Sequence, residues 1–249
     1  VVGQAGVWRS TNSGVNWSLI LSGQNVNGLS FPDNNIGYVT ADSGRIFKTN
    51  DGGINWTLIV TGVNQNLKGV SFTNTNTGWA VGLGGTIIRT TTNGTSWQVQ
   101  TAQFSLNYNG IFMSNSSTGY IFGGTNEEAW LYTANSGQNW LYTLNNPGNS
   151  ICGGSHIPTL QNGVMYVGTS GRIRKSTNNG LSWSNISSGT SVKLNSIQFV
   201  DAATSYIIGD FGTILKSTNG GINWFFQTSN TTYNLKSISL INSGVGWVV

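Results

Sequence analysis

Charged residues are scarce in this chain of 249 residues: they make up 7% of the sequence, against about a quarter in a typical soluble domain. Proline occurs only 3 times and cysteine once. The single cysteine excludes an intramolecular disulfide framework and a multi-cysteine metal site. No apolar run reaches the roughly 18 residues of a spanning helix, so we expect no membrane insertion. The 11 basic and 7 acidic residues are scattered, and therefore no nucleic-acid-binding surface is expected.

Glycine and aromatic residues are abundant instead, with 35 Gly, 10 Trp and 37% hydrophobic residues. That content excludes a disordered chain and favours one large all-β domain. The polar residues are mostly hydroxyl and amide side chains, a composition typical of secreted bacterial repeat proteins. We therefore expect an extracellular or cell-surface location in a bacterium, with a periplasmic or lumenal one as the alternative. The N-terminus lacks a signal-peptide pattern, so an exported protein would be seen here in its mature form, compatible with one module of a multidomain chain.

One octapeptide occurs six times, with the pattern Ser/Thr-x-Asp/Asn/Thr-x-Gly-x-x-Trp, and its tryptophans lie 39 to 43 residues apart. The residues after the last tryptophan and before the first make up one more interval, which indicates a closed cycle of six repeats cut within one repeat. The third position of the octapeptide is held by Asn12, Asp51, Thr92, Asn135, Asn178 and Asn219. The tryptophans are Trp17, Trp56, Trp97, Trp140, Trp183 and Trp224.

Each period also contains four short β-strand patterns and no helical one, which is typical of a propeller blade. The sequence predicts an all-β fold: a six-bladed β-propeller of four-stranded antiparallel blades, closed by pairing the N- and C-terminal strands in one blade. A single domain would span residues 1–249. Its blades are predicted at 235–249 with 1–21, 27–60, 67–101, 109–144, 150–187 and 194–228.

The octapeptide is predicted to be a folding element rather than a ligand site. Its Asp or Asn side chain can bond to the backbone amides two residues on, its Gly allows positive φ, and its Trp packs between blades. A residue repeated at equivalent places answers a structural need. Thr92 lacks the carboxylate or amide, so its turn should be the weakest.

With these motifs, and with stretches such as 78–90 and 212–221, the chain resembles the Asp-box, or bacterial neuraminidase repeat, propellers. It is most similar to the photosystem II assembly-factor-like repeat family. The resemblance covers essentially the whole chain and implies a propeller fold. It is a poor guide to activity, because the same box occurs in sialidases, xyloglucanases and sortilin-type receptors.

No catalytic residue, metal site or cofactor is predicted. The carboxylates outside box-side turns are Asp42, Asp210 and the pair Glu127-Glu128, all expected in turns on the opposite rim. They fall on alternate blades, which is farther apart than the roughly 5 to 9.5 Å of a glycosidase pair. Three converging arginines for a sialidase are also lacking, because only Arg45 and Arg172 begin third strands there.

Three other features have plain structural interpretations. His156 is expected in a loop, and Cys152 is expected as a packed thiol at a first-strand position equivalent to Ser30 and Ser71. Basic residues precede five of the six boxes, and their stems are expected to lie along apolar neighbours. These residues are Arg9, Lys48, Arg89, Lys175 and Lys216.

A binding surface is predicted where the chain enters each first strand, on the face opposite the boxes. The residues at these entries are Asn27, Lys68, Asn109, Asn149, Asn195 and Lys236. Tyr108 and Tyr233 stand beside them, and Asp42 and Asp210 are placed at the edge of the surface. Amide, ammonium and aromatic groups could hold a peptide or a glycan, so a protein or carbohydrate partner is expected.

The sequence thus favours a non-catalytic binding or scaffold propeller module. A glycoside hydrolase of the sialidase or xyloglucanase kind is the alternative, and an assembly factor of the photosystem type is the third hypothesis.

Overall fold

The structure is a computed structural model, and it describes residues 2–3, 6–9, 11, 16, 18–101, 105–124, 127–147, 151–156, 163–236, 238–242 and 245–248. Two compact units divide it: one comprises Val1–Ile121 with Tyr132–Leu141, the other Phe122–Leu131 with Tyr142–Val249. Within the described part the chain forms β-strands and two short 3-10 turns, η1 (Leu83–Gly85) and η2 (Thr169–Gly171). No helix there is long and apolar enough to cross a membrane.

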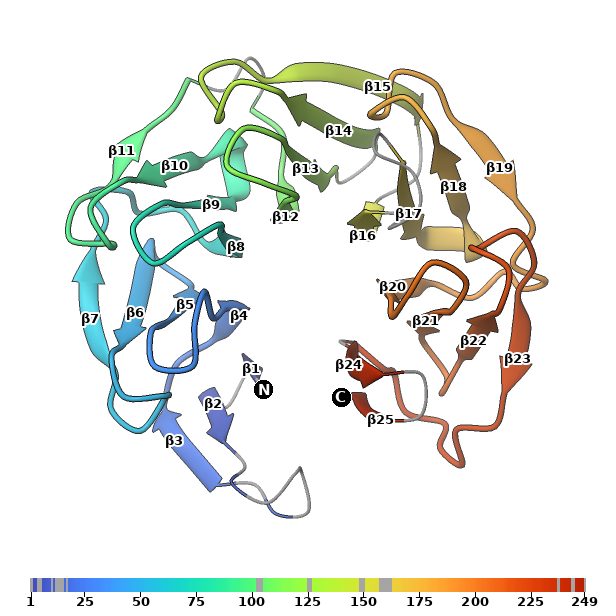
Figure 1. Ribbon diagram of the computed structural model, residues 1–249, viewed down its shortest axis with the longest axis horizontal. Coiled ribbons are helices and arrows are strands. Elements are labelled where there is room, and N and C mark those ends of the chain that lie inside the picture. The colour runs from blue at the N-terminus through green and yellow to red at the C-terminus, as the bar shows by residue number, and fades with distance from the viewer. Residues whose placement is uncertain are drawn as a thin grey trace. The chain divides into compact units, whose positions relative to one another are not determined.

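Five sheets have four strands each, and in each the strands pair in the order of the sequence (Figure 1). They are β4 (Val26–Ser30), β5 (Gly37–Ala41), β6 (Arg45–Thr49) and β7 (Thr57–Val60); β8 (Leu67–Phe72), β9 (Gly78–Gly82), β10 (Ile87–Thr90) and β11 (Gln98–Val99); β12 (Tyr108–Met113), β13 (Gly119–Gly123), β14 (Glu127–Thr133) and β15 (Leu141–Pro147); β16 (Ile151–His156), β17 (Val164–Gly168), β18 (Ile173–Ser176) and β19 (Ser184–Ile186); β20 (Leu194–Phe199), β21 (Ser205–Gly209), β22 (Ile214–Ser217) and β23 (Phe225–Gln227). The predicted all-β fold of four-stranded antiparallel blades is confirmed.

Two smaller sheets lie at the ends of the chain. One is β1 (Val2–Gly3), β2 (Gly6–Arg9) and β3 (Ser18–Ser22); the other is β24 (Ile238–Asn242) and β25 (Val245–Val248). The short pairing of β1 with β2 was not foreseen. The predicted blade formed by residues 235–249 and 1–21 would combine segments of both units, and it stays a prediction. The predicted blade boundaries also stay a prediction.

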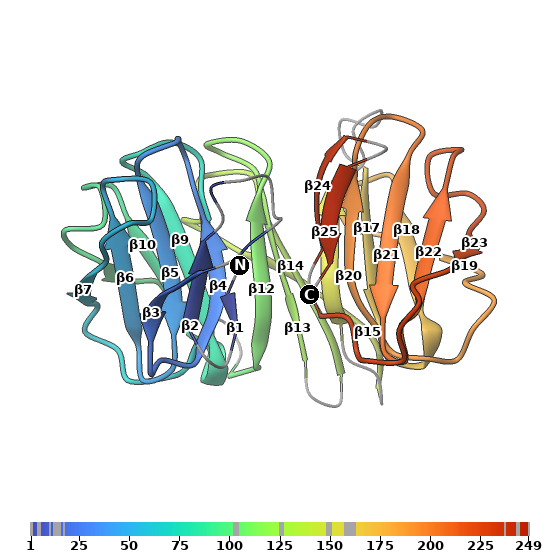
Figure 2. The ribbon, with the colours of Figure 1, turned by 90° about the horizontal axis from the view of Figure 1, so that it is seen from below.

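Within a sheet the strands run alongside one another and the loops gather at the two ends, as the β4–β5–β6 group shows in Figure 2. In four of the five four-stranded sheets the second strand is buried along its whole length. These strands are β5, β9, β13 and β17. Such strands read as continuous apolar runs because both faces are covered. Between the β4–β7 and β8–β11 sheets, for example, Tyr38, Leu67 and Ile88 belong to one core cluster.

The boxes form the turns between third and fourth strands. In five of them a buried Ser or Thr hydroxyl accepts a hydrogen bond from the box glycine, as from Gly53 N–H to Thr49 Oγ1 at 2.9 Å. The glycines have positive φ, 83° at Gly53, which suits glycine alone among common residues. The Asp51 carboxylate accepts from the amides of Ile54 and Asn55 at 3.0 and 2.9 Å. Asn12 and Trp17 of the first box lie outside the described residues, as does the rest of that box apart from Thr11 and Asn16.

Three of the five basic residues before the boxes lie over aromatic rings of the neighbouring second strand. Lys48 pairs across the sheet with Tyr38, and its Nζ is 5.8 Å from the ring centroid. Arg89 stands over Trp79 at 5.2 Å, and Lys216 over Tyr206 at 5.3 Å. These cation–π contacts account for Lys48, Arg89 and Lys216 as packing elements.

Two segments that were expected to be loops or turns are β-strand instead. Glu127 and Glu128 were expected in a turn but begin β14, and His156 was expected in a loop but ends β16. In the latter case His156 pairs with Val164, so the hairpin extends farther than the polar sequence around it indicates. Hairpin pairing of the backbone thus overrides the local composition at both places.

Candidate binding site

The two ends of each sheet are built from different turns. At one end the turn after the first strand meets the box turn, as in the hydrogen bond from Gly52 N–H to Asn35 O at 2.9 Å. At the other end the turn after the second strand meets the connection that leads into the first strand. Asp42 N–H bonds there to Asn25 O at 3.2 Å, and Asp210 N–H to Lys193 O at 2.9 Å. The candidate site is at this second end.

A β-bulge lies at the start of the first strands. The pairing between β4 and β5 skips one residue between Val26 and Gly28, and the same shift recurs in three other first strands. A bulge leaves one residue out of the ladder and turns its side chain away from the regular alternation. The residues at the four shifts are Asn27, Lys68, Cys152 and Asn195.

The residue after the bulge is glycine in several strands, because neighbouring first strands touch backbone to backbone. A Cβ added at Gly69 would lie 2.8 Å from the Cα of Gly110, and one added at Gly153 would lie 2.9 Å from the Cα of Ser196. Only glycine fits so close an approach. The bulge residues of consecutive sheets are therefore neighbours within each unit.

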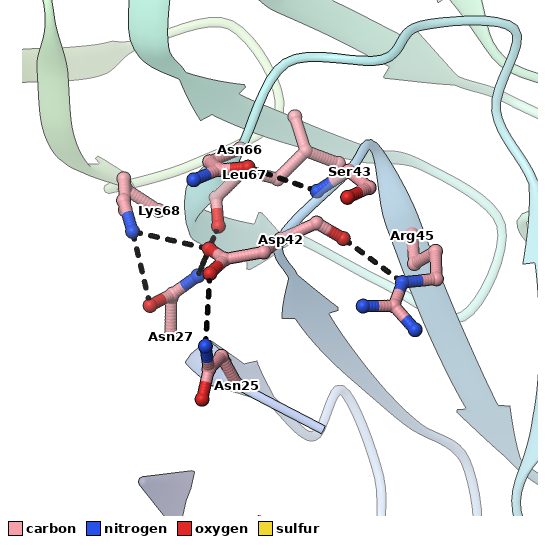
Figure 3. A network of polar contacts seen from close by, with 8 residues as sticks. All are labelled: Asn25, Asn27, Asp42, Ser43, Arg45, Asn66, Leu67 and Lys68. Atoms are coloured by element: carbon pink, nitrogen blue, oxygen red, sulfur yellow. Dashed lines mark hydrogen bonds and ion pairs between the residues drawn. The ribbon is translucent and has the colours of Figure 1, made fainter. Parts of the chain in front are cut away.

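In the first unit the bulges build what we call the Asp42 network: Asn25, Asn27, Asp42 and Lys68 (Figure 3). Asn27 Nδ2 donates to Asp42 Oδ1 at 3.0 Å and to the carbonyl oxygen of Leu67 at 2.9 Å. Lys68 Nζ lies 3.3 Å from Asp42 Oδ1 and 3.2 Å from Asn27 Oδ1. One carboxylate thus joins two adjacent sheets, and the turn around it is completed by Arg45, whose Nε donates to Asp42 O at 3.0 Å.

The second unit repeats this arrangement as the Asp210 network: Asn195, Asp210 and Lys236. Asn195 Nδ2 donates to Asp210 Oδ1 at 2.7 Å and to the carbonyl oxygen of Leu235 at 2.8 Å. Lys236 Nζ lies 2.7 Å from Asp210 Oδ1. The three residue types keep the same sequence separations as Asn27, Asp42 and Lys68, so this is a second copy of one device.

Both carboxylates are held in the ionised form. The hydrogen bond from Asn27, followed by that from Lys68, lowers the pKa of Asp42 despite partial burial. At Asp210 burial raises the pKa, but hydrogen bonds from Lys236 and Asn195 and the charges of Lys236 and Lys193 outweigh it, and the net shift is downward. Opposite charges and donors favour the charged form. Neither group is arranged as a proton donor at neutral pH.

The structure brings together most of the predicted site residues. Asn27, Asp42 and Lys68 are in direct contact, and so are Asn195, Asp210 and Lys236; the aspartates are central to the networks, whereas the sequence placed them at the edge. Tyr233 is 82% exposed, but Tyr108 is fully buried and does not line a surface, so its assignment was wrong. Asn109 is half-buried at its predicted place beside the first strand, and Asn149 lies outside the described residues.

Cys152 was assigned to the wrong position by the sequence. The pairing register places it at the bulge, equivalent to Asn27 and Lys68, whereas Ser155 matches Ser30 and Ser71. The sequence does contain a signal for this alignment: a tripeptide of an apolar residue, a variable residue and Gly or Ser recurs at the start of the first strands. Burial raises the pKa of its thiol, and the charges of Lys193, Asp210 and Lys236 also act on it. Cys152 therefore adjoins the Asp210 network.

Two of the arginines at this end have polar partners close by in the chain or in the same sheet. Arg45 is bonded within the Asp42 network, and Arg174 Nε donates to Asn185 Oδ1 on the outer strand β19 at 3.0 Å. Among the described residues, no group of three or more His, Cys, Asp or Glu side chains could hold a metal ion.

Several known proteins are similar to this chain in sequence or in structure. The family model of the photosynthesis system II assembly factor YCF48 matches residues 55–190. No curated protein matches. A solved structure of YCF48 bound to a D1 peptide shares 19% identity over 90% of each chain, with a TM-score of 0.53. YCF48 from Cyanidioschyzon merolae shares 16% identity over 90% of this chain and 92% of that one, with a TM-score of 0.52.

A GH74 enzyme from Niastella koreensis is also similar, with 16% identity and a TM-score of 0.73 over 92% of this chain but only 43% of the enzyme. At such identities the likeness shows the fold, a β-propeller of the bacterial neuraminidase repeat type. The family match covers more than half of the sequence, and the chain therefore belongs to the family of the photosynthesis system II assembly factor YCF48.

Proposed function

We propose that this chain is a non-catalytic propeller module that binds a segment of a partner protein, as an assembly factor does, at the end of its sheets opposite the boxes. The observation that carries the proposal is the repeated Asn–Asp–Lys network, which holds an ammonium group at the surface in each unit. The side chain of Lys68 is 29% exposed and that of Lys236 55% exposed, while each is anchored on a carboxylate. A fixed, accessible cation is a common polar anchor in protein recognition. The similar YCF48 structure with a D1 peptide supports a protein ligand rather than a glycan.

A glycoside hydrolase is the weaker candidate. Its general acid must be protonated at neutral pH, which requires a raised pKa. The pKa values of Asp42 and Asp210 are lowered instead, and their oxygens are occupied by Asn and Lys donors. The GH74 likeness extends over less than half of that enzyme. A carbohydrate partner stays the alternative ligand for the same surface.

The proposal includes a location outside the cytoplasm, either extracellular or at the cell surface, or in a periplasm or lumen. It is supported by the scarcity of charge and by the polar surface of hydroxyl and amide groups. Fractionation of the source cells with an antibody against this chain tests it. A purely cytoplasmic signal would contradict it.

Titration calorimetry of the intact chain with a D1 peptide is the direct test of the proposed function. We expect saturable binding that Lys236→Gln or Lys68→Gln weakens about tenfold, or about 1.4 kcal/mol. Lys175→Gln is the matched control, since it removes the same charge from the box-side end of a third strand. Absence of binding, or equal loss in the control, would contradict the proposal.

The hydrolase hypothesis has its own assay. Xyloglucan incubated with the chain should release no reducing ends above the buffer blank. Release that disappears in Asp210→Asn would favour the enzyme over the binding module.

A further inference from the structure

Phe211 has an unusual backbone conformation next to the Asp210 network. It lies in the turn between β21 and β22 with φ of 54°, in the left-handed region. The equivalent turn positions are Ser43, Gly84 and Ser170, with φ of 61°, 63° and 57°. Small residues tolerate this region, whereas a bulky aromatic there is an outlier, and such strain concentrates at functional sites. Folding alone would favour a small residue at position 211.

Its side chain gains no burial that would offset this strain. Phe211 is 73% exposed, and Tyr233, in the connection after β23, is 82% exposed. The two loops are bonded to one another: Phe211 N–H donates to Asn234 Oδ1 at 3.0 Å, and Gly212 N–H to Tyr233 O at 2.7 Å. Two large aromatic side chains are thus fixed on adjoining backbone with most of their surface in water. Isolated exposed apolar residues are common, but a pair held in this way indicates a recognition surface.

The charges beside the aromatic pair are unequal. Lys236 Nζ lies 2.7 Å from Asp210 Oδ1, and Lys193 acts on the same carboxylate electrostatically. One carboxylate is thus under the influence of two ammonium groups, of which that of Lys236 is in contact with it. An ammonium has three N–H donors, and the contact with Asp210 uses one. A carboxylate on the ligand would neutralise the remaining positive charge.

We propose that Phe211, Tyr233 and Lys236 form a binding site for an extended acidic peptide segment that carries an aromatic residue next to a carboxylate. The aromatic rings supply large apolar contact area at low cost in conformational entropy, and Lys236 receives the carboxylate. The excess positive charge favours a carboxylate over a neutral glycan, whose hydroxyl groups can accept hydrogen bonds from the ammonium but cannot balance its charge. This inference rests on the proposed function and names the class of partner for the second unit.

The Asp42 network serves as an internal control, because it has the same Asn, Asp and Lys groups without the aromatics, and has Asn25 in the place of Lys193. Position 43 is Ser where the second copy has Phe211, and position 65 is Gln where the second copy has Tyr233. If the aromatics exist for binding, then replacing them with the residues of the first copy or with glycine should remove affinity without loss of stability. For Phe211→Gly the stability should stay level or rise, because glycine suits positive φ.

The experiment is a fluorescence anisotropy titration of the intact chain with a labelled nonapeptide of alanine and serine that has a central phenylalanine between two aspartates and blocked ends. We expect Phe211→Gly, Tyr233→Gln and Lys236→Gln each to weaken binding about tenfold, and Ser43→Gly to leave it unchanged. The melting temperature of Phe211→Gly should not fall. Binding should weaken with added salt, and a peptide with lysines in place of the aspartates should bind far more weakly.

Three results would overturn the inference. The first is equal binding of the lysine peptide, and the second is unchanged affinity in all three variants. The third is saturable binding of cellohexaose that the same variants weaken, which would assign the site to a glycan. If Lys236→Gln or Lys68→Gln weakens binding of the D1 peptide but Phe211→Gly and Tyr233→Gln do not, the aromatic site is wrong and the proposed function stands. If neither peptide binds the wild-type chain, both fail.

Discussion

The box end of the sheets and the opposite end follow different rules. At the box end, five turns repeat one pattern of contacts, with a buried Ser or Thr hydroxyl receiving the glycine amide at 2.8 to 3.1 Å. At the other end the equivalent turn positions hold Asp42, Leu83, Thr169 and Asp210. Uniform contacts satisfy the same folding requirement in every blade, whereas an asymmetric partner needs groups that differ from blade to blade. Contacts that recur in all five of these turns therefore indicate structure, and positions whose residues change from sheet to sheet indicate recognition.

Replacing a box tryptophan should have the largest effect on stability among the tests of this comparison. Trp224 is buried in a core cluster with Met165 and Phe199, so Trp224→Ala should cost about 3 to 5 kcal/mol of unfolding free energy. Urea unfolding followed by circular dichroism measures it. Peptide affinity of the folded fraction should be unchanged. Lost affinity at full stability would show that the box end also binds ligands.

The two network aspartates give a smaller effect that tests whether the copies are equivalent. Asp42→Ala and Asp210→Ala each remove a carboxylate that joins two sheets, and each should cost about 1 kcal/mol, since the pairs are partly exposed to solvent. The same unfolding experiment compares them. A difference greater than about twofold would show that the aromatic loops change the structural role of the second copy.

Acid should affect the box end through Asp51. Hydrogen bonds from Asn55, from its amide and then its side chain, and from Thr49 lower the pKa of Asp51 to about 2. A carboxylate with a lowered pKa stabilises the fold fully above its unfolded pKa of about 4, and the stabilisation is lost as the pH falls through the folded pKa. The melting temperature should therefore fall between pH 4 and pH 2. Asp51→Asn should reduce this fall, because other boxes already have Asn; an identical pH profile would contradict the assignment.

The smallest effect is expected at the third box. Thr92 Oγ1 accepts one backbone amide, from Ser96 at 3.1 Å, whereas the Asp51 carboxylate accepts two. Thr92→Asp should therefore stabilise the chain by about 0.5 kcal/mol. A rise in melting temperature at neutral pH that disappears near pH 2 would support the interpretation. A fall would show that the third turn depends on the threonine methyl group instead.

The repeat made the strands and box turns predictable, because period and turn chemistry are local properties of the sequence. The bulges were not predictable from that period, since pairing register depends on the partner strand. For this reason Cys152 was matched to Ser30 rather than to Asn27. Tyr108 was misplaced because neighbours in a strand point to opposite sides: it precedes Asn109 in sequence, but its own side chain is buried in the core.

The lysine–aspartate contacts were missed for a related reason. Asp42 and Lys68 are separated in the chain by most of a repeat, and Asp210 and Lys236 by the same interval. Each pair meets only when the first strand of one sheet packs against the turn of the sheet before it. The sequence identified the participants, but not that they act together.

The glycine contacts between first strands also bear on how such a protein can evolve. Where Gly28, Gly69 and Gly153 let neighbouring backbones touch, the contact between the first strands is made by the backbone and does not depend on the bulge side chains. Asn, Lys and Cys occupy the bulges of nearly identical strands. Single substitutions at these positions can change charge and hydrogen bonding while the fold stays intact, so new ligands can be acquired one residue at a time.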